Sequence, residues 1–282
     1  MSILSLDSRK IIIFAVVVIV AFTGFYTFYS GNWQRGQAPL TEITLSECSG
    51  SLTILYDNYE YDSSCQAEWG FSCLVELEEQ TILFDTGGEP DVLLANMASL
   101  EVDPMDIDCI VISHEHWDHI GGIHAVLEVN SDVTVYLPAC FSNEFKAGVR
   151  AKADIVETEN ATMICDSVCT TRVLHEGVSE QSLMIETCEG IIVLTGCSHS
   201  GVHNLVEDAV NLTGEDVCFV MGGYHLGSAS DHMLNLIFHR MEECGVEKLA
   251  PTHCTGDDSI DAFNEAWGED CLRVGVGFRM DF

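Results

Sequence analysis

The strongest constraint on this sequence is a dense group of metal-type side chains between residues 114 and 119. Three histidines and two acidic residues share these six positions, in the order His-Glu-His-Trp-Asp-His. The preceding run, residues 109–113, has the length and β-branched content of a buried strand, and Gly121-Gly122 breaks the chain afterwards. The pattern therefore places the group on a loop at the end of a strand. There it indicates a metal site rather than a solvated polar loop.

The spacing within this group predicts two metal ions. Alternate side chains of an extended segment share a face, so His114 and His116 can bind one ion. Asp118 and His119 lie past the bend and can turn toward a second ion. Imidazole and carboxylate ligands suit zinc, manganese and iron. We expect two divalent ions, with zinc as the first choice and manganese or iron as alternatives.

The N-terminal part of the chain predicts a membrane anchor. Residues 11–29 form an uncharged apolar stretch that is about long enough to cross a bilayer as a helix. Arg9 and Lys10 precede it, and the positive-inside tendency then places residues 1–10 in the cytoplasm. A cleaved signal peptide is the alternative, but no clear cleavage site follows the stretch. We expect a single-pass membrane protein with an anchor at 11–29, a linker at 30–48 and an extracytoplasmic domain at 49–282.

Charge and cysteine content bear on the partners. The chain has 45 acidic and 11 basic residues and a net charge of −34, which repels polyanions and argues against a nucleic-acid partner. We therefore expect a small-molecule substrate. Some of the 13 cysteines would form disulfides in an extracytoplasmic domain, whereas in a reducing compartment they would act as small buried apolar residues. The oligomeric state is not readable from the sequence.

Apolar runs and turn signals predict an α/β domain. We expect strands at 52–56, 71–77, 81–84, 109–113, 133–137, 182–186 and 191–194. We expect helices at 91–100, 123–128, 203–211 and 232–244. This alternation is typical of a mixed sheet flanked by helices.

Three later segments repeat the pattern of an apolar run, a short break and a histidine. Residues 191–201 contain Cys197 and His199, residues 218–226 contain His225, and residues 248–256 contain His253. In an α/β sheet such strand ends converge on one rim, where ligands and metals bind. We expect these side chains to join the group at 114–119.

Several motifs resemble those of the metallo-β-lactamase fold superfamily. His114, His116, Asp118 and His119 match its His-x-His-x-Asp-His hallmark, and Asp85 in Phe-Asp-Thr-Gly also fits. The segments 57–59, 68–72, 195–201, 222–226 and 251–256 look like the subfamily of 7,8-dihydropterin-6-yl-methyl-4-(β-D-ribofuranosyl)aminobenzene 5'-phosphate synthase-like metal-dependent hydrolases. The resemblance covers about residues 52–282. It implies an αββα sandwich of two mixed sheets, with helices outside and a metal site along one edge.

The resemblance also implies a set of metal ligands. His114 and His116 would bind the first ion, and Asp118, His119 and His253 the second. The superfamily usually has a bridging aspartate where this chain has Cys197, and a thiolate there would either bind metal or pack. His199 or His175 would complete the first set, and we prefer His199. Asp85 would support a ligand.

Two ions lower the pKa of water and hold it in line with a carbonyl or phosphoryl group, so hydrolysis is the expected reaction. Asp118 would orient the hydroxide and transfer its proton, and His225 would help stabilise charge on the substrate oxygen. Asn58, Trp69 and Phe71 would bind substrate, although the two aromatic residues fit a core equally well. We expect a hydrolase of a small ester, lactone, thioester or phosphoester. The alternatives are a synthase-type transferase of the resembling subfamily and a noncatalytic or redox metal sensor.

Overall fold

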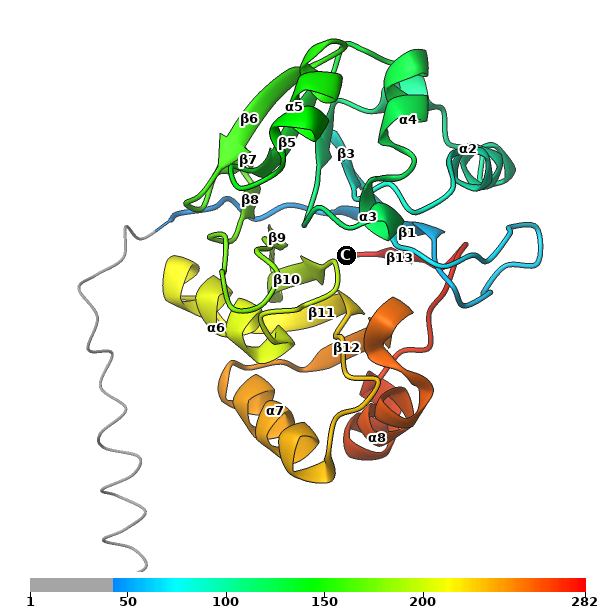
Figure 1. The fold of residues 1–282 in the computed structure, drawn as a ribbon. Coiled ribbons are helices and arrows are strands. Elements are labelled where there is room, and N and C mark those ends of the chain that lie inside the picture. Colours follow the sequence, from blue (N-terminus) through cyan, green and yellow to red (C-terminus); the bar gives the residue numbers. More distant parts are fainter. Residues whose placement is uncertain (1–42) are drawn as a thin grey trace, which may run out of the picture. The chain divides into compact units, whose positions relative to one another are not determined.

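The computed structural model describes residues 43–282. The chain divides into two units, residues 1–40 and 41–282, and all that follows concerns the second. Its centre consists of a seven-stranded and a six-stranded sheet that pack against each other, with helices on the two outer faces (Figure 1).

The seven-stranded sheet has the order β13-β1-β2-β3-β4-β5-β6. It is antiparallel from β13 to β3 and parallel from β3 to β6. The strands are β1 (Gly50–Tyr56), β2 (Ser72–Leu77), β3 (Thr81–Phe84), β4 (Cys109–Val111), β5 (Thr134–Pro138), β6 (Asp154–Thr158) and β13 (Arg279–Asp281). The helices packed on its outer face are α2 (Pro90–Ser99), α4 (Ile123–Val129) and α5 (Asn143–Arg150).

The six-stranded sheet has the order β12-β11-β10-β9-β8-β7. Its pairs from β7 to β10 are antiparallel, and β10, β11 and β12 are parallel. The strands are β7 (Met163–Cys165), β8 (Val168–Thr170), β9 (Leu183–Thr187), β10 (Gly190–Thr195), β11 (Val217–Gly223) and β12 (Lys248–Thr252). The helices on its outer face are α6 (Val202–Thr213), α7 (Asp231–Glu243) and α8 (Asp257–Trp267).

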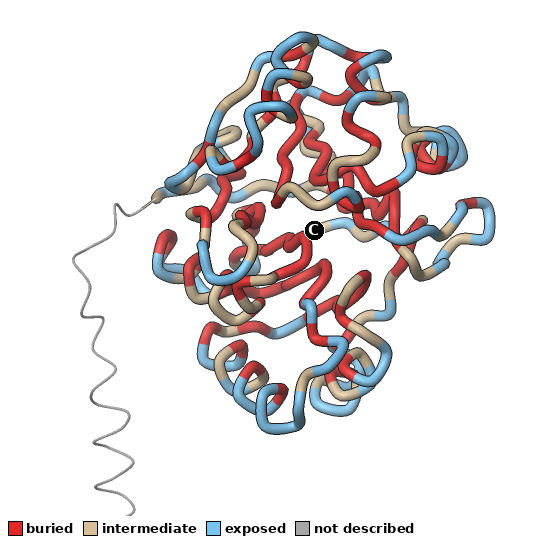
Figure 2. The backbone as a smooth tube through the Cα atoms, viewed as in Figure 1, coloured by how far each residue is buried: buried red, intermediate tan, exposed pale blue. Residues whose placement is uncertain are grey.

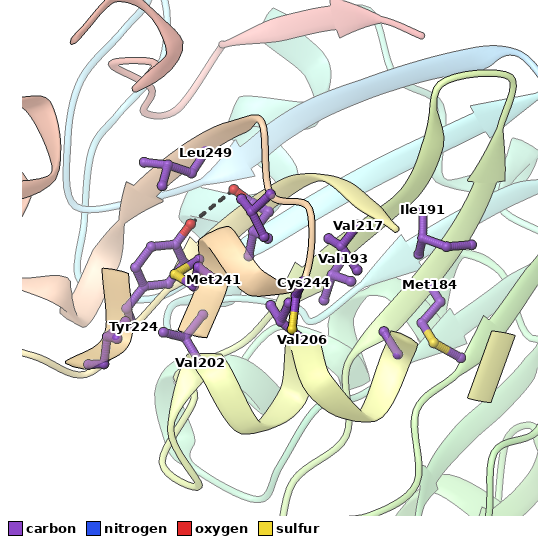
Figure 3. Packing of buried hydrophobic residues seen from close by; sticks show 14 of the residues in the cluster. Met184, Ile191, Val193, Val202, Val206, Val217, Tyr224, Met241, Cys244 and Leu249 are labelled. Carbon is purple, nitrogen blue, oxygen red and sulfur yellow. Dashed lines mark hydrogen bonds between the residues drawn. The ribbon is translucent and has the colours of Figure 1, made fainter. Parts of the chain in front are cut away.

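Strand periodicity explains this layering. Successive side chains of a strand point to opposite faces, so a strand buried on both sides is apolar throughout. In β10, Ile191 and Val193 pack toward the helices, and Ile192 and Leu194 pack between the two sheets. The helix-side cluster includes Tyr224, whose hydroxyl donates a 2.9 Å hydrogen bond to the carbonyl oxygen of Val220 (Figure 3).

The predicted α/β fold with two packed sheets is confirmed. Buried residues follow the strands and the inner faces of the helices, and exposed residues lie on the outer turns and loops (Figure 2). The structure adds elements that the sequence patterns did not predict, namely α5, β6, β7, β8, α8 and β13, and also the short helix α3 (Trp117–Ile120) within the segment predicted to be a loop. All thirteen cysteines are free thiols, and eight of them are buried.

The predicted single-pass membrane location is wrong. Within residues 43–282, no helix has both the length and the apolar character needed to cross a bilayer. The segment at 11–29, on which that prediction was based, lies outside the described residues, as do residues 1–10 and most of the predicted linker.

Candidate metal centre

Strand ends from both sheets bring the candidate ligands to one place. His114, His116, Asp118 and His119 follow β4, and Asp85 follows the neighbouring parallel strand β3. Cys197 and His199, His225, and His253 follow β10, β11 and β12 in that order. Because β10, β11 and β12 are parallel, their carboxyl ends lie on the same edge of the second sheet.

The first set of ligands consists of His114, His116 and His199. His116 Nδ1 lies 3.1 Å from His114 Nε2 and 3.2 Å from His199 Nε2. All three ring nitrogens lie within 4.8 Å of one another, which suits one ion at their centre. His175 lies elsewhere, with its exposed ring bound to Glu159 and Ser179. The structure thus brings together the preferred set and not the alternative with His175.

The second set consists of Asp118, His119 and His253. Asp118 Oδ2 lies 3.5 Å from His253 Nε2 and 4.0 Å from His119 Nε2. Cys197 Sγ lies 3.2 Å from His119 Nε2 and groups with both His114 and His119. The thiol therefore lies between the two sets, at the place that the resemblance gives to a bridging aspartate.

Hydrogen bonds behind the ligands direct their free nitrogens toward this centre. The Ser113 hydroxyl donates to Asp85 Oδ2 at 2.7 Å and therefore accepts from His114 Nδ1 at 2.8 Å. His119 Nδ1 donates to the same carboxylate at 2.7 Å. In each ring the proton thus sits on Nδ1 and leaves the Nε2 lone pair free for metal.

His253 is oriented in the same way by Asn58. The Asn58 amide nitrogen donates to the His253 carbonyl, so its oxygen accepts from His253 Nδ1 at 2.9 Å. His253 Nε2 is then a buried nitrogen without a hydrogen-bond partner, which a metal ion would satisfy. This orphaned atom and the convergent lone pairs show that the residues fit a metal centre.

Burial and neighbouring charges also favour the protonation states of metal ligands. Burial lowers the pKa of His114, and the adjacent His119 and His116 lower it further, so the ring is neutral. Burial would raise the pKa of Asp118, but the His253 ring 3.5 Å from its carboxylate and the nearby His119 outweigh this and lower it. Burial raises the pKa of Asp85 to about 8, while the hydrogen bonds from Ser113 act in the opposite direction.

Strained backbone is concentrated in the loops of this centre. Five non-glycine residues among those described have positive φ, and four of them are Asp85 (56°), Ser198 (57°), His225 (52°) and His253 (51°). Such conformations cost free energy and persist where the surrounding structure enforces them, commonly at functional sites.

Comparison with known proteins agrees with this geometry. Residues 70–253 match the model of the metallo-beta-lactamase superfamily. The chain belongs to this superfamily. Metallo-beta-lactamase superfamily members are generally enzymes, and they bind divalent metals, typically zinc.

Three relatives illustrate the range of similarity within the superfamily. The 7,8-dihydropterin-6-methyl-4-(beta-D-ribofuranosyl)-aminobenzene-5'-phosphate synthase of Methanocaldococcus jannaschii is 26% identical over 82% of this chain and 95% of its own length. Tm1679, a metal-dependent hydrolase of the beta-lactamase superfamily, has 29% sequence identity to this chain. Its crystal structure matches this one with a TM-score of 0.71, and the match covers 83% of this chain and 99% of Tm1679. YhfI from Bacillus subtilis shares the fold, with 14% identity and a TM-score of 0.65 over 84% of this chain and 100% of its own.

The three residues expected to bind substrate occupy different positions in this superfamily fold. Trp69 is 45% exposed, and its indole nitrogen donates to Asp118 Oδ2 at 2.8 Å. Phe71 is fully buried beneath the centre, where its ring packs near Phe84 and His253. Asn58 holds His253, as described above. Only Trp69 therefore combines contact with the ligand sets and an exposed surface.

The structure brings three further residues to the centre that the sequence patterns did not single out. Ser113 links Asp85 to His114, and Cys254 groups with Cys197 and His225. Glu180 accepts a 2.6 Å hydrogen bond from the backbone of Ser200, next to His199. The sequence could have indicated Cys254, because it directly follows the predicted ligand His253. No pattern in the sequence around Glu180 indicates a functional residue.

Proposed function

We propose that the protein is a binuclear metal-dependent hydrolase that acts on a small ester, lactone, thioester or phosphoester. The observation that carries this proposal is the meeting of two three-residue ligand sets, one with His114, His116 and His199 and one with Asp118, His119 and His253, with Cys197 between them. Three of the histidines are held from behind so that a free nitrogen faces the centre.

Bound ions would supply a water of lowered pKa and polarise the substrate oxygen. Asp118 is the residue best placed to orient the attacking water and accept its proton, because its carboxylate lies among the second set of ligands. The Trp69 indole fixes this carboxylate through Oδ2. The lowered pKa of Asp118 keeps it ionised, as a proton acceptor must be.

His225 lies at the rim of the same centre. Its exposed ring packs against His199 with a centroid separation of 4.3 Å. A side chain there can donate to an oxygen that gains charge during the reaction. In this role His225 would act on the substrate rather than on the attacking water.

A second candidate is a transferase of the synthase type. It is favoured by the similarity to the Methanocaldococcus jannaschii synthase, which extends over nearly all of that protein. Binuclear chemistry serves transfer as well as hydrolysis, because the two reactions differ in whether water or another nucleophile attacks. Assays of a ribofuranosyl-aminobenzene phosphate with and without a dihydropterin as co-substrate separate the two candidates.

Metal content of the full-length chain tests the proposal. The protein is purified without added metal and measured by elemental mass spectrometry beside His116→Ala and a control, His239→Ala, whose exposed ring lies on α7. We expect at least two divalent ions per chain, at least one fewer in His116→Ala, and no change in the control. Hydrolysis of a panel of phosphoesters, lactones and thioesters should fall with the metal. A folded protein that contains no metal and hydrolyses none of them contradicts the proposal.

A further inference from the structure

A third group of metal-type side chains lies next to the two ligand sets. Cys197, His225 and Cys254 follow three adjacent parallel strands, and their ligand atoms lie within 4.8 Å of one another. Cys197 belongs to both this group and the binuclear centre. Cys254 has no part in the proposed hydrolysis, so this group calls for a separate explanation.

The arrangement of the three side chains leads from the interior to solvent. Cys197 is 3% exposed, Cys254 is partly buried, and His225 is exposed. Cys254 Sγ lies 3.6 Å from the Cys197 carbonyl oxygen, which places the two residues side by side. His225 is therefore the member of the group that meets solvent.

The backbone is adapted to this close approach. A Cβ on Gly223 would lie 2.7 Å from Cys254 Sγ and 2.6 Å from the Gly196 carbonyl, so a larger residue at 223 would occupy the place of the thiol. His225 is held at a φ of 52°, in the left-handed region that non-glycine residues adopt only uncommonly. The loop after β11 thus adopts a backbone conformation of higher free energy, and this conformation places His225 beside Cys254.

A buried carboxylate nearby supplies negative charge. Glu180 is 1% exposed and uses Oε1 to accept from the Ser200 backbone, while Oε2 is buried without a hydrogen-bond partner. The Ser200 backbone that it accepts from adjoins His199, whose ring packs against His225 with a centroid separation of 4.3 Å. An unpaired buried carboxylate is costly unless a positive charge compensates it, and a cation among the neighbouring thiols would do so.

We propose that Cys197, His225 and Cys254 form a third cation site that binds a thiophilic divalent ion such as zinc. Two thiolates and an imidazole, with one position left open, are a ligand set that zinc accepts. Tetrahedral zinc with its usual bonds to sulfur separates two sulfur ligands by about 3.8 Å, which is compatible with the observed grouping. The Cys197 thiolate would be shared with the ion held by His119.

This site changes the role of His225. A ring that binds a cation no longer donates to substrate, and the open position on that cation would contact the substrate oxygen instead. The site does not depend on hydrolysis, since it makes a prediction about metal binding alone.

Cobalt binding tests the third site directly, because thiolate ligands give bound Co²⁺ a charge-transfer absorption that imidazole and carboxylate do not. The full-length chain is reduced, stripped with a chelator and titrated with Co²⁺. We expect three equivalents and a thiolate band for the unaltered protein. Cys254→Ser should bind one equivalent fewer and lose roughly half of the band, since one of the two thiolates is gone.

Matched variants separate this result from misfolding and from the binuclear centre. Cys140→Ser changes an exposed cysteine and should bind three equivalents with the full band. His225→Ala alters an exposed side chain and should lose the same equivalent as Cys254→Ser. His116→Ala should lose an ion of the first set while it retains the band. A Cys254→Ser variant with an unaltered stoichiometry and band would overturn the third site and leave the binuclear proposal intact, whereas a protein that binds no Co²⁺ overturns both.

Discussion

The two sheets supply ligands in different ways. The segment between β4 and α4, called the first loop below, contributes His114, His116, Asp118 and His119 from six consecutive residues, the last two from the short helix α3 (Trp117–Ile120). The second sheet contributes its ligands from three separate loops, which follow β10, β11 and β12 and are far apart in the sequence. The first loop is therefore a local motif, and the second group exists only once three parallel strands are in register.

The supports of the two groups differ in the same sense. Asp85 and Ser113 together hold both buried histidines of the first loop, so a single carboxylate orients two ligands. On the second sheet, His253 has its own partner in Asn58 and its own strained backbone. Damage to the support of the first loop should therefore spread to both ligand sets, whereas damage to the support of His253 should stay local.

The largest expected effect comes from the first loop itself. Asp118→Asn removes the proposed proton acceptor and an anionic metal ligand, so kcat/KM should fall by about 10²- to 10⁴-fold on any substrate found in the panel. Glu115→Gln is the matched control, because Glu115 lies in the same loop but binds Ser142 away from the ligands. Equal activity of the Asp118→Asn variant and the control would remove Asp118 from the mechanism.

The next effect concerns the shared support. Asp85→Asn replaces a carboxylate that accepts hydrogen bonds from Ser113 and His119. The NH2 group of the introduced amide cannot accept a hydrogen bond, so one of these donors loses its acceptor. We expect metal affinity to fall by about 10- to 100-fold at both ligand sets, as measured by competition with a chromogenic chelator. Asp132→Asn, an exposed change, serves as control. Weakening of one ion alone would contradict the shared support.

The corresponding change at the support of His253, the ligand after β12, should be smaller and confined. Asn58→Ala removes the acceptor that holds His253 Nδ1, but His253 keeps its backbone position. We expect roughly a 10-fold loss of affinity for one ion, with the other unaffected. Titration with the same chelator checks this, and a loss at both ions would show that the two groups are not independently supported.

The same difference between adjacent and dispersed ligands explains which parts of the site can be predicted from the sequence. The motif at 114–119 can be recognised in the sequence because its ligands are close together and follow a buried apolar strand. The α/β fold is predicted by the alternation of such strands with helices. The grouping of His199, His225 and His253 was expected from their repeated place after apolar runs. The preference for His199 over His175 came from the subfamily motif, because sequence spacing alone does not tell which loop folds back toward His116, and in the structure His199 is the one that lies beside His116.

The missed features lack any periodic signal. β6 and β7 are partly exposed edge strands, and β8 has only three residues, all of them buried, so none of the three shows a clear alternation of buried and exposed side chains. Phe71 fitted a pocket and a core equally well in the sequence, because aromatic residues suit both, and its complete burial is visible only in the structure. Glu180 and Cys254 acquire their meaning from tertiary neighbours on other strands.

The smallest expected effect tests the link between an exposed ring and the first loop. Trp69→Phe keeps an aromatic ring at the rim but removes the donor to Asp118 Oδ2. A hydrogen bond of this kind contributes about 1 kcal/mol, so kcat should fall roughly fivefold. The loss should appear in kcat rather than KM, since the ring that faces substrate remains. Trp117→Phe, a change of the exposed indole adjacent to Asp118 in sequence, should leave kcat unaltered. If Trp69→Phe instead raises KM alone, the indole contacts the substrate, and the Asp118 carboxylate does not depend on Trp69 for its orientation.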